Sequence, residues 1–217
     1  MHQSINNLVS IQNTLKIENL ELNRIKIIAV SKTFPINEIL PLIKHGQVHF
    51  GENKVQEAIE KWQEIKKDFK HLQLHMIGNL QTNKVKFAVP LFDYIHSLDS
   101  LKLAKKISEE QNKIKKKLKI FIQVNIGNEE QKNGINVADL NEFYKICANE
   151  LELDIVGLMC LPPKNDDTKE YFVKMKNLAQ KINVKELSMG MSKDYLEASN
   201  YGATYIRLVS KIFGNRN

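Results

Sequence analysis

The residue with the clearest chemical potential is Lys32, which follows an apolar run in the stretch Ile27-Ile-Ala-Val-Ser-Lys-Thr33. A short apolar run bounded by polar residues is typical of a strand buried on both faces of a parallel sheet. An amine at the carboxyl end of such a strand is partly desolvated, which lowers its pKa and frees it to attack a carbonyl group. The alternative is a lysine that only extends from the strand end into solvent. Lys32 is therefore a candidate nucleophile.

A second stretch with chemical potential is Ser188-Met-Gly-Met-Ser192, which offers two hydroxyls and a glycine just before an expected helix. Backbone N–H groups at such a position can bind an anion. An aldehyde that carries a phosphate would satisfy both this stretch and Lys32, and pyridoxal 5′-phosphate is such a molecule. Arg207, further along the chain, would then face the pyridine nitrogen, where an arginine keeps the nitrogen unprotonated. The alternative for Arg207 is a surface arginine in a salt bridge.

The elements that must position these residues alternate between strand and helix along the whole chain. The expected strands cover 26–30, 48–50, 73–77, 94–95, 119–125, 154–159, 186–189 and 204–208. The expected helices cover 37–45, 54–67, a short segment from 82, 100–117, 137–149, 167–181 and 193–200. Eight such units predict an α/β fold, a (β/α)8 TIM barrel. An open doubly wound sheet is the alternative, but it would want a glycine-rich loop after the first strand. We expect one domain over 1–217, with a leading helix at 4–22 and the barrel over 25–217.

Polar or small residues follow nearly every expected strand, and these strand ends meet at the carboxyl-terminal face where barrels carry their active sites. They are Lys32, Asn53, Gly78-Asn79, His96-Ser97, Asn125, Met159, Ser188, Ser192 and Arg207. Caps and turns also use such residues, so the set predicts a pocket only when taken together. We expect His49 and His75 to have packing roles and His96 to line the mouth. The histidines and cysteines show no metal-ligand spacing.

Composition restricts the function classes. The 217 residues carry a net charge of +7, 42% apolar residues and two cysteines, without an apolar run long enough to span a bilayer. No disulfide framework or signal peptide is indicated, so we expect a cytoplasmic protein. The densest basic run, 113–119, closes an expected helix and has no interleaved aromatic residues. Nucleic-acid binding is therefore disfavoured.

Several motifs together resemble the YggS/PROSC family of pyridoxal phosphate homeostasis proteins. They are Ala29-Val-Ser-Lys-Thr33, Phe50-Gly-Glu-Asn53 with Val55-Gln-Glu57, His75-Met-Ile-Gly78 with Leu80-Gln81 and Asn83-Lys84, His96-Ser97 with Asp99, Gln123-Val-Asn125, Gly157-Leu-Met159, Leu187-Ser-Met-Gly-Met-Ser192 and Ile212-Phe-Gly214. The resemblance covers the chain from about residue 25 to its end. It implies a barrel similar to the N-terminal domain of alanine racemase, with Lys32 forming a Schiff base with the cofactor.

The resemblance also implies that the phosphate is bound by Ser188, Ser192 and the segment after Arg207. The family usually reads Arg-Ile-Gly-Thr there, whereas this chain has Val209 in place of the glycine and Ser210 in place of the threonine. Lys54 is a second departure, at a position where the family commonly has an aromatic residue. The complete set of expected cofactor-binding residues is Lys32, Asn53, Met159, Ser188, Ser192, Arg207, Val209 and Ser210.

The expected function is that of a carrier of pyridoxal phosphate, which contributes to cofactor homeostasis and to the balance of amino and keto acids. Racemases built on this barrel use a second domain that supplies another base, and the 217 residues are consumed by the barrel. We therefore expect a non-enzyme, with apo-enzymes as recipients, no membrane partner and a monomeric state. A weak amino-acid racemase or another Schiff-base enzyme is the alternative. A basic interaction module that uses residues 113–119 is the third.

Overall fold

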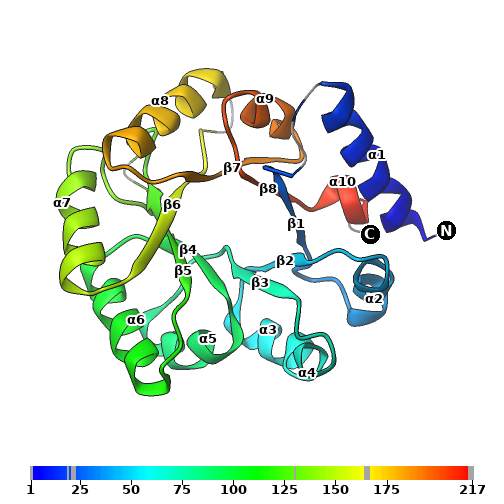
Figure 1. Ribbon diagram of the computed structural model, residues 1–217, viewed down its shortest axis with the longest axis horizontal. Coiled ribbons are helices and arrows are strands. Elements are labelled where there is room, and N and C mark those ends of the chain that lie inside the picture. Colours follow the sequence, from blue (N-terminus) through cyan, green and yellow to red (C-terminus); the bar gives the residue numbers. More distant parts are fainter. Residues whose placement is uncertain (1, 19, 21–22, 130, 164–166, 215–217) are drawn as a thin grey trace.

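The computed structural model describes residues 2–18, 20, 23–129, 131–163 and 167–214. Eight parallel strands close into a barrel in chain order, with β1 paired to both β2 and β8 (Figure 1). The strands are β1 (Lys26–Val30), β2 (His49–Glu52), β3 (Gln73–Met76), β4 (Tyr94–Leu98), β5 (Lys119–Val124), β6 (Asp154–Cys160), β7 (Glu186–Met191) and β8 (Tyr205–Leu208). The prediction of a (β/α)8 barrel is confirmed, and the open sheet is excluded.

Helices surround the barrel, and the leading helix α1 lies beside the last helix α10 (Figure 1). The α-helices are α1 (Gln3–Ile17), α2 (Ile36–Lys44), α3 (Val55–Trp62), α4 (Ile65–Asp68), α5 (Val85–Leu91), α6 (Leu101–Ile114), α7 (Leu140–Lys145), α8 (Thr168–Lys181), α9 (Tyr195–Asn200) and α10 (Ser210–Phe213). A 3₁₀ turn, η1 (Thr82–Lys84), precedes α5, and a π-helical turn, η2 (Ile146–Glu150), follows α7. The Asn7 amide donates to the Ile212 carbonyl at 2.9 Å and so ties α1 to α10. None of the described helices is long and apolar enough to cross a membrane.

Apolar side chains fill two layers because successive residues of a strand point to opposite faces. Ile27 and Ala29 of β1 belong to the large core between the strands and the helices. Ile28 and Val30 point into the barrel. There they join an inner cluster completed by Tyr94, Phe121, Met159 and Tyr205.

Several expected boundaries were wrong, each for a local reason. The leading helix, expected to reach 22, ends at Ile17, and residues 19, 21 and 22 lie outside the described part. The helix expected over 100–117 ends at Ile114, because Lys115 takes the left-handed conformation with φ 52°. The expected helix 54–67 is divided into α3 and α4. Strand β4 continues to Leu98, four residues from its start, rather than stopping after two residues.

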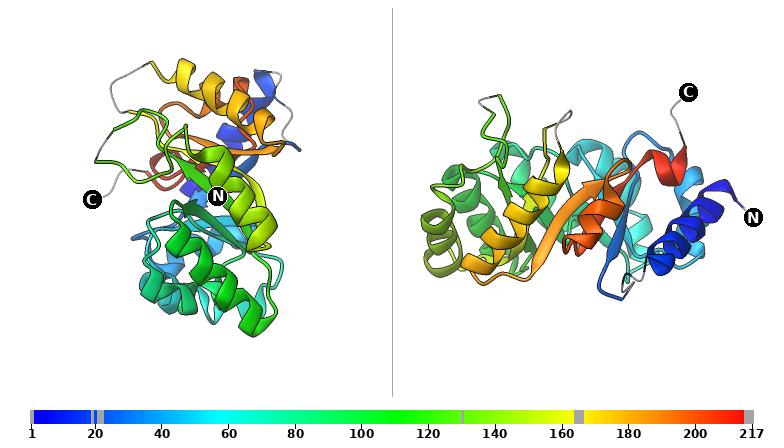
Figure 2. Two further views of the ribbon diagram at one scale, coloured as in Figure 1. Left: turned by 90° about the vertical axis from the view of Figure 1, so that its left-hand side faces the viewer. Right: turned by 90° about the horizontal axis from the view of Figure 1, so that it is seen from above.

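The two ends of the barrel carry different features. The loops after β5 and β6 leave from one end, and β1 begins at the other, as the view from above separates them (Figure 2). The predicted site residues follow or end strands, so the candidate site lies at the carboxyl end of the barrel.

Candidate functional site

Lys32 is the second residue after β1 and is partly buried. The alternation along β1 places Ile28 and Val30 inward and Ser31 outward, so Lys32 falls on the inward side at the barrel mouth. Asn53 takes the corresponding place after β2, because Val30 pairs with Gly51 and the Ser31 N–H continues the ladder to the Gly51 carbonyl.

The backbone around Lys32 is held by Lys61 and Glu57 of α3, which together with Glu52 of β2 are called the clamp below. Lys61 Nζ donates to the Ser31 carbonyl at 2.8 Å, and the Thr33 N–H donates to Glu57 Oε1. Lys61 also forms ion pairs with Glu57 at 3.0 Å and with the fully buried Glu52 at 2.9 Å. Both peptide groups that flank Lys32 are thus fixed from outside the barrel.

Glu52 is the centre of this clamp. Its Oε1 accepts hydrogen bonds from Ser31 Oγ at 2.7 Å and Trp62 Nε1 at 2.9 Å, in addition to Lys61, whereas its Oε2 is buried without a partner. Partial burial alone would raise the pKa of Glu57, but the hydrogen bond from Thr33 and the interaction with Lys61 outweigh it and hold the pKa below its usual value. Sequence reasoning missed the clamp, although the i,i+4 spacing of Glu57 and Lys61 was a signal for their pairing.

Ser188 and Arg207 meet inside the barrel. Arg207 Nη1 donates to Ser188 Oγ at 2.6 Å, and Nη2 donates to the Cys160 carbonyl at 2.9 Å. Both side chains are buried, and burial lowers the pKa of Arg207 from its ordinary value. The surface alternative for Arg207 is therefore excluded. The predicted residue Met159 pairs in register with Ser188 and packs in the inner cluster.

Ser192, Val209 and Ser210 lie together beyond the ends of β7 and β8. The Val209 N–H donates to Ser192 Oγ at 3.3 Å, and Ser210 opens α10 with an exposed side chain. Val209 has φ −107°, so a β-branched residue fits at this position without the freedom of a glycine. Gly190 does need that freedom, because it has φ +90° and a Cβ there would lie 2.6 Å from Ala198 Cβ.

The expectation for His96 was wrong. Because β4 extends to Leu98, His96 lies within the strand, fully buried, rather than at the mouth. Its ring stacks on Phe121 with 4.2 Å between centroids, and its Nδ1 is hydrogen-bonded to Ser188 Oγ at 2.8 Å. Asp99, which follows β4, is a further titratable group. Its partial burial raises the pKa of its carboxyl group.

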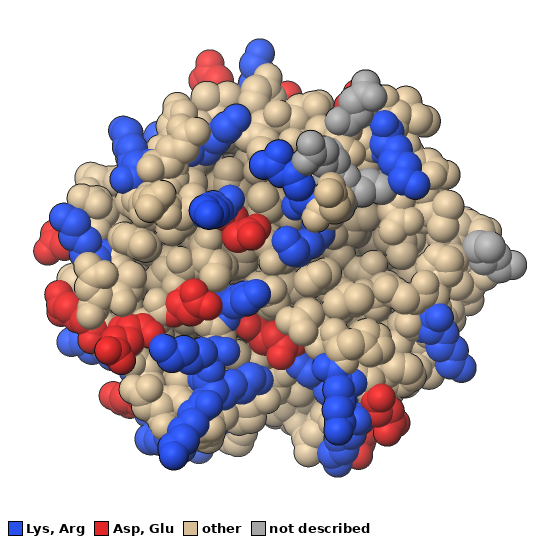
Figure 3. Space-filling model, viewed as in Figure 1, with Lys and Arg blue, Asp and Glu red and all other residues tan. Residues whose placement is uncertain are grey.

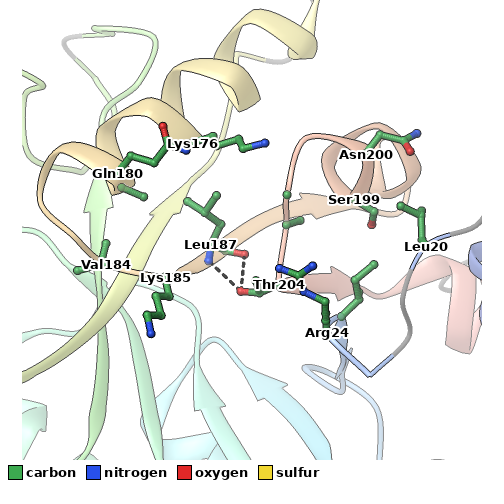
Figure 4. A pocket seen from close by; sticks show the side chains of 14 residues that line it. Leu20, Arg24, Lys176, Gln180, Val184, Lys185, Leu187, Ser199, Asn200 and Thr204 are labelled. Atoms are coloured by element: carbon green, nitrogen blue, oxygen red, sulfur yellow. Dashed lines mark hydrogen bonds between the residues drawn. The ribbon is translucent and has the colours of Figure 1, made fainter.

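Hollows open at both ends of the molecule. Beside Asn53 a hollow of about 370 Å³ is lined by Lys54, Asn79 and Lys84, among others. A larger one, of about 590 Å³, lies at the opposite end, where β7, β8 and β1 begin (Figure 4). There Thr204 Oγ1 accepts a hydrogen bond from the Leu187 N–H at 2.8 Å, so its hydroxyl links the starts of β7 and β8. This second hollow is separate from the candidate site.

The donor set at the carboxyl end fits a small anionic carbonyl compound. It combines Lys32 on the inward side of the barrel mouth, the hydroxyls of Ser192 and Ser210, and the buried guanidinium of Arg207. Such groups can hold a phosphate and bind an aldehyde covalently. Within the described ranges, no group of three or more histidine, cysteine, aspartate or glutamate residues could hold a metal ion.

Comparisons with known proteins agree in fold over nearly the whole chain. The family model described as alanine racemase, N-terminal domain, matches residues 7–216. A pyridoxal phosphate homeostasis protein of Haemophilus influenzae is 36% identical, with the alignment covering 95% of this chain and 92% of that protein. The Escherichia coli K12 protein of the same name is 34% identical, covering 89% and 86%.

Solved structures give the same result. PipY of Synechococcus elongatus with PLP bound matches with a TM-score of 0.86 and 34% identity, covering 98% of this chain and 100% of that chain. Alanine racemase of Clostridium difficile matches with a TM-score of 0.76 and 18% identity, covering 99% of this chain and 57% of that one. At that identity the second likeness shows the fold alone.

Proposed function

The chain belongs to the family of pyridoxal phosphate homeostasis proteins, and we propose that it carries pyridoxal 5′-phosphate as a Schiff base on Lys32. In this role it contributes to the homeostasis of the cofactor and to the balance of amino and keto acids. The observation that carries the proposal is the clamped Lys32 at the same barrel end as the buried Ser188–Arg207 pair. The PLP-bound structure of PipY supports the choice of ligand.

Each predicted site residue has a role in this proposal. Ser192, Ser210 and the backbone N–H groups of this segment bind the phosphate. Arg207, held by Ser188, faces the ring nitrogen, and Asn53 and Met159 line the mouth and floor of the site. When bound, the cofactor supplies an electrophilic aldehyde on an electron-withdrawing ring.

The way in which the carboxylates near Lys32 are used supports a non-catalytic role. Turnover of amino acids requires an acid/base group that can exchange protons close to the reacting atoms. Glu52 and Glu57 instead form ion pairs with Lys61 behind the strand, and the pKa of Glu57 lies below its usual value. These carboxylates are therefore poor proton-transfer groups.

The decisive experiment is absorption spectroscopy of the purified protein with and without added pyridoxal phosphate. We expect a visible band in the parent that is absent from Lys32→Ala, and borohydride reduction followed by peptide mass mapping that locates the cofactor on Lys32. Lys54→Ala is the matched control, because Lys54 is an exposed lysine at the same barrel end. Equal bands in the parent and in Lys32→Ala would contradict the proposal.

A transfer assay tests the carrier role itself. Protein loaded with pyridoxal phosphate and freed of excess ligand should activate an apo-enzyme that depends on this cofactor. Loaded Lys32→Ala should not do so.

The enzymatic alternative is a weak racemase or another Schiff-base enzyme. Racemase turnover in the parent that is lost in Lys32→Ala would favour it over the carrier.

We place the protein in the cytoplasm as a monomer. Both cysteines, Cys147 and Cys160, are buried free thiols, which suits a reducing compartment. Light scattering coupled to size exclusion would give the mass of a monomer. The basic interaction module is disfavoured, because Lys113 pairs with Glu110, Lys116 donates to the Pro90 and Phe92 carbonyls, and carboxylates intermix with the lysines on this face (Figure 3).

A further inference from the structure

Three histidines form a continuous hydrogen-bonded line inside the barrel, referred to below as the histidine ladder. His49 Nδ1 lies 2.9 Å from His75 Nε2, and His75 Nδ1 lies 2.9 Å from His96 Nε2. His96 Nδ1 then lies 2.8 Å from Ser188 Oγ, which accepts from Arg207. His49 is the first residue of β2, so the ladder begins at the end of the barrel opposite Lys32 and reaches the residues of the candidate site.

The surroundings of the ladder keep it uncharged near neutral pH. His75 and His96 are fully buried and stack on Tyr94 and Phe121, each with 4.2 Å between ring centroids. Burial lowers the pKa of both rings well below the ordinary value, and burial together with nearby lysines lowers the pKa of His49 to about 4. Each ring therefore has one N–H donor and one acceptor nitrogen.

The connectivity then requires all three rings to share one tautomer. Every link joins the Nδ1 of one ring to the Nε2 of the next, and the last Nδ1 meets the serine oxygen. If His96 carries its proton on Nε2, His75 must accept on Nδ1 and hence carry its own proton on Nε2, and the same holds for His49. The opposite arrangement has all protons on Nδ1. A mixed set would bring two N–H groups or two lone pairs face to face.

The two arrangements differ at Ser188. When the rings are protonated on Nε2, the Ser188 hydroxyl donates to His96. When they are protonated on Nδ1, Ser188 accepts from both His96 and Arg207, and its hydroxyl proton is free to be donated to a ligand.

We propose that the histidine ladder is a proton relay, which couples the proton of Ser188 in the site to the opposite end of the barrel. In one passage His49 releases a proton from Nε2 while its Nδ1 takes the proton of His75. His75 Nδ1 takes the Nε2 proton of His96, and His96 Nδ1 takes the hydroxyl proton of Ser188. Ser188 then takes a proton from water or from an acidic group of the ligand at the mouth. One proton enters and one leaves, and no net charge remains in the barrel. The inference rests on the proposed function for the identity of the ligand, but the ladder itself does not.

Charged groups flank the ladder chiefly at its outer end. Lys26 and Lys119 lie near His49 and disfavour its protonation, whereas Asp93 favours it. Lys66 acts on His75 and Arg207 on His96, both against protonation. Since only His49 is partly exposed, it is the ring through which protons would exchange with solvent.

The test is ¹⁵N NMR of histidine-labelled protein, which distinguishes protonated from unprotonated ring nitrogens. The exposed rings His45 and His71 give reference signals in the same sample. In the ligand-free protein we expect His49, His75 and His96 to be neutral and to share one tautomer. Neighbouring rings with different tautomers would overturn the inference, whether or not the protein binds pyridoxal phosphate.

Transmission along the ladder is tested at His49, the ring farthest from the site. Ser188→Ala removes the hydroxyl at the inner end of the ladder, and the experiment needs no ligand. We expect this change to alter the tautomer populations of His49. His75→Phe keeps the ring that stacks on Tyr94 but breaks the relay, so adding the serine substitution to it should leave His49 unchanged. His71→Gln is the control and should behave as the parent. If His75→Phe does not fold, His96→Gln serves as the interrupting variant.

Pyridoxal phosphate added to the parent, with binding followed by visible absorbance, should shift His49 from one tautomer toward the other. Binding that leaves the His49 signals unchanged would refute the relay while preserving the proposed function. Absence of binding would refute the proposed function. The relay would then be tested by Ser188→Ala, and tautomer populations of His49 that equal those of the parent would refute it.

Discussion

Replacement of Lys61 by methionine tests whether the clamp behind Lys32 contributes to stability. The Lys61 side chain is 8% exposed and Glu52 is fully buried. Lys61→Met keeps most of the apolar stem but leaves the Glu52 carboxylate with only the hydrogen bonds from Ser31 and Trp62, and with Oε2 still unpartnered. Removing one partner of a buried ion pair costs about 3–5 kcal/mol of unfolding free energy. At about 2–4 °C per kcal/mol for a chain of this size, the melting temperature should fall by about 6–20 °C.

Denaturant unfolding of four proteins provides the measurement: the parent, Lys61→Met, Glu52→Gln and the double variant. Glu52→Gln in the methionine background removes the uncompensated charge, so the double variant should be more stable than Lys61→Met by about 2 kcal/mol. Lys67→Met is the control, because its pair with Glu64 is exposed, and it should change stability by less than about 0.5 kcal/mol. A loss below about 1 kcal/mol in Lys61→Met, or a double variant no more stable than it, would refute the reasoning.

Three further outcomes follow from the same physical arguments. Lys115→Gly should raise the unfolding free energy by about 1 kcal/mol, because Lys115 has φ 52° at the end of α6; lower stability in denaturant unfolding would contradict this. Cys147 and Cys160, whose thiol pKa values burial raises to about 12, should resist iodoacetamide at pH 8 in the native protein and react after unfolding, as mass spectrometry would show. The pKa of His49 falls from 6.5 to about 4 on folding, so between these values the unfolded state binds more protons and stability should decline as pH falls. The slope from this ring is at most about 1.4 kcal/mol per pH unit. Denaturant unfolding between pH 7 and 4 measures it, and His49→Gln should have a shallower slope.

The fold was predictable because its signals are local. Apolar runs such as 27–30 and 120–122 are short, rich in β-branched residues and bounded by polar residues, and helical patterns separate them. The eightfold alternation then restricts the topology to very few choices. The boundaries failed where a single backbone conformation decides, as at Lys115.

The candidate site was predictable only in part. Strand ends in a parallel barrel meet at one face, so the sequence could indicate Lys32, Asn53 and the segments around Ser192 and Ser210 as neighbours. The direct contact between Ser188 and Arg207 required the register of β7 and β8, which shifts between Ser188 and Met191.

By itself the sequence determined the barrel and indicated Lys32 as the candidate nucleophile and 188–192 as the candidate anion-binding stretch, because periodicity and residue chemistry are properties of short segments. Only the tertiary structure decided which polar groups are buried together. Lys61 and Glu52 form an ion pair behind Lys32. His96, which was expected at the mouth, lies inside the barrel in a line with His75 and His49. Such partnerships depend on strand register and on the inward or outward direction of each side chain. Since a shift of one residue reverses that direction, they are fixed only when all eight strands close.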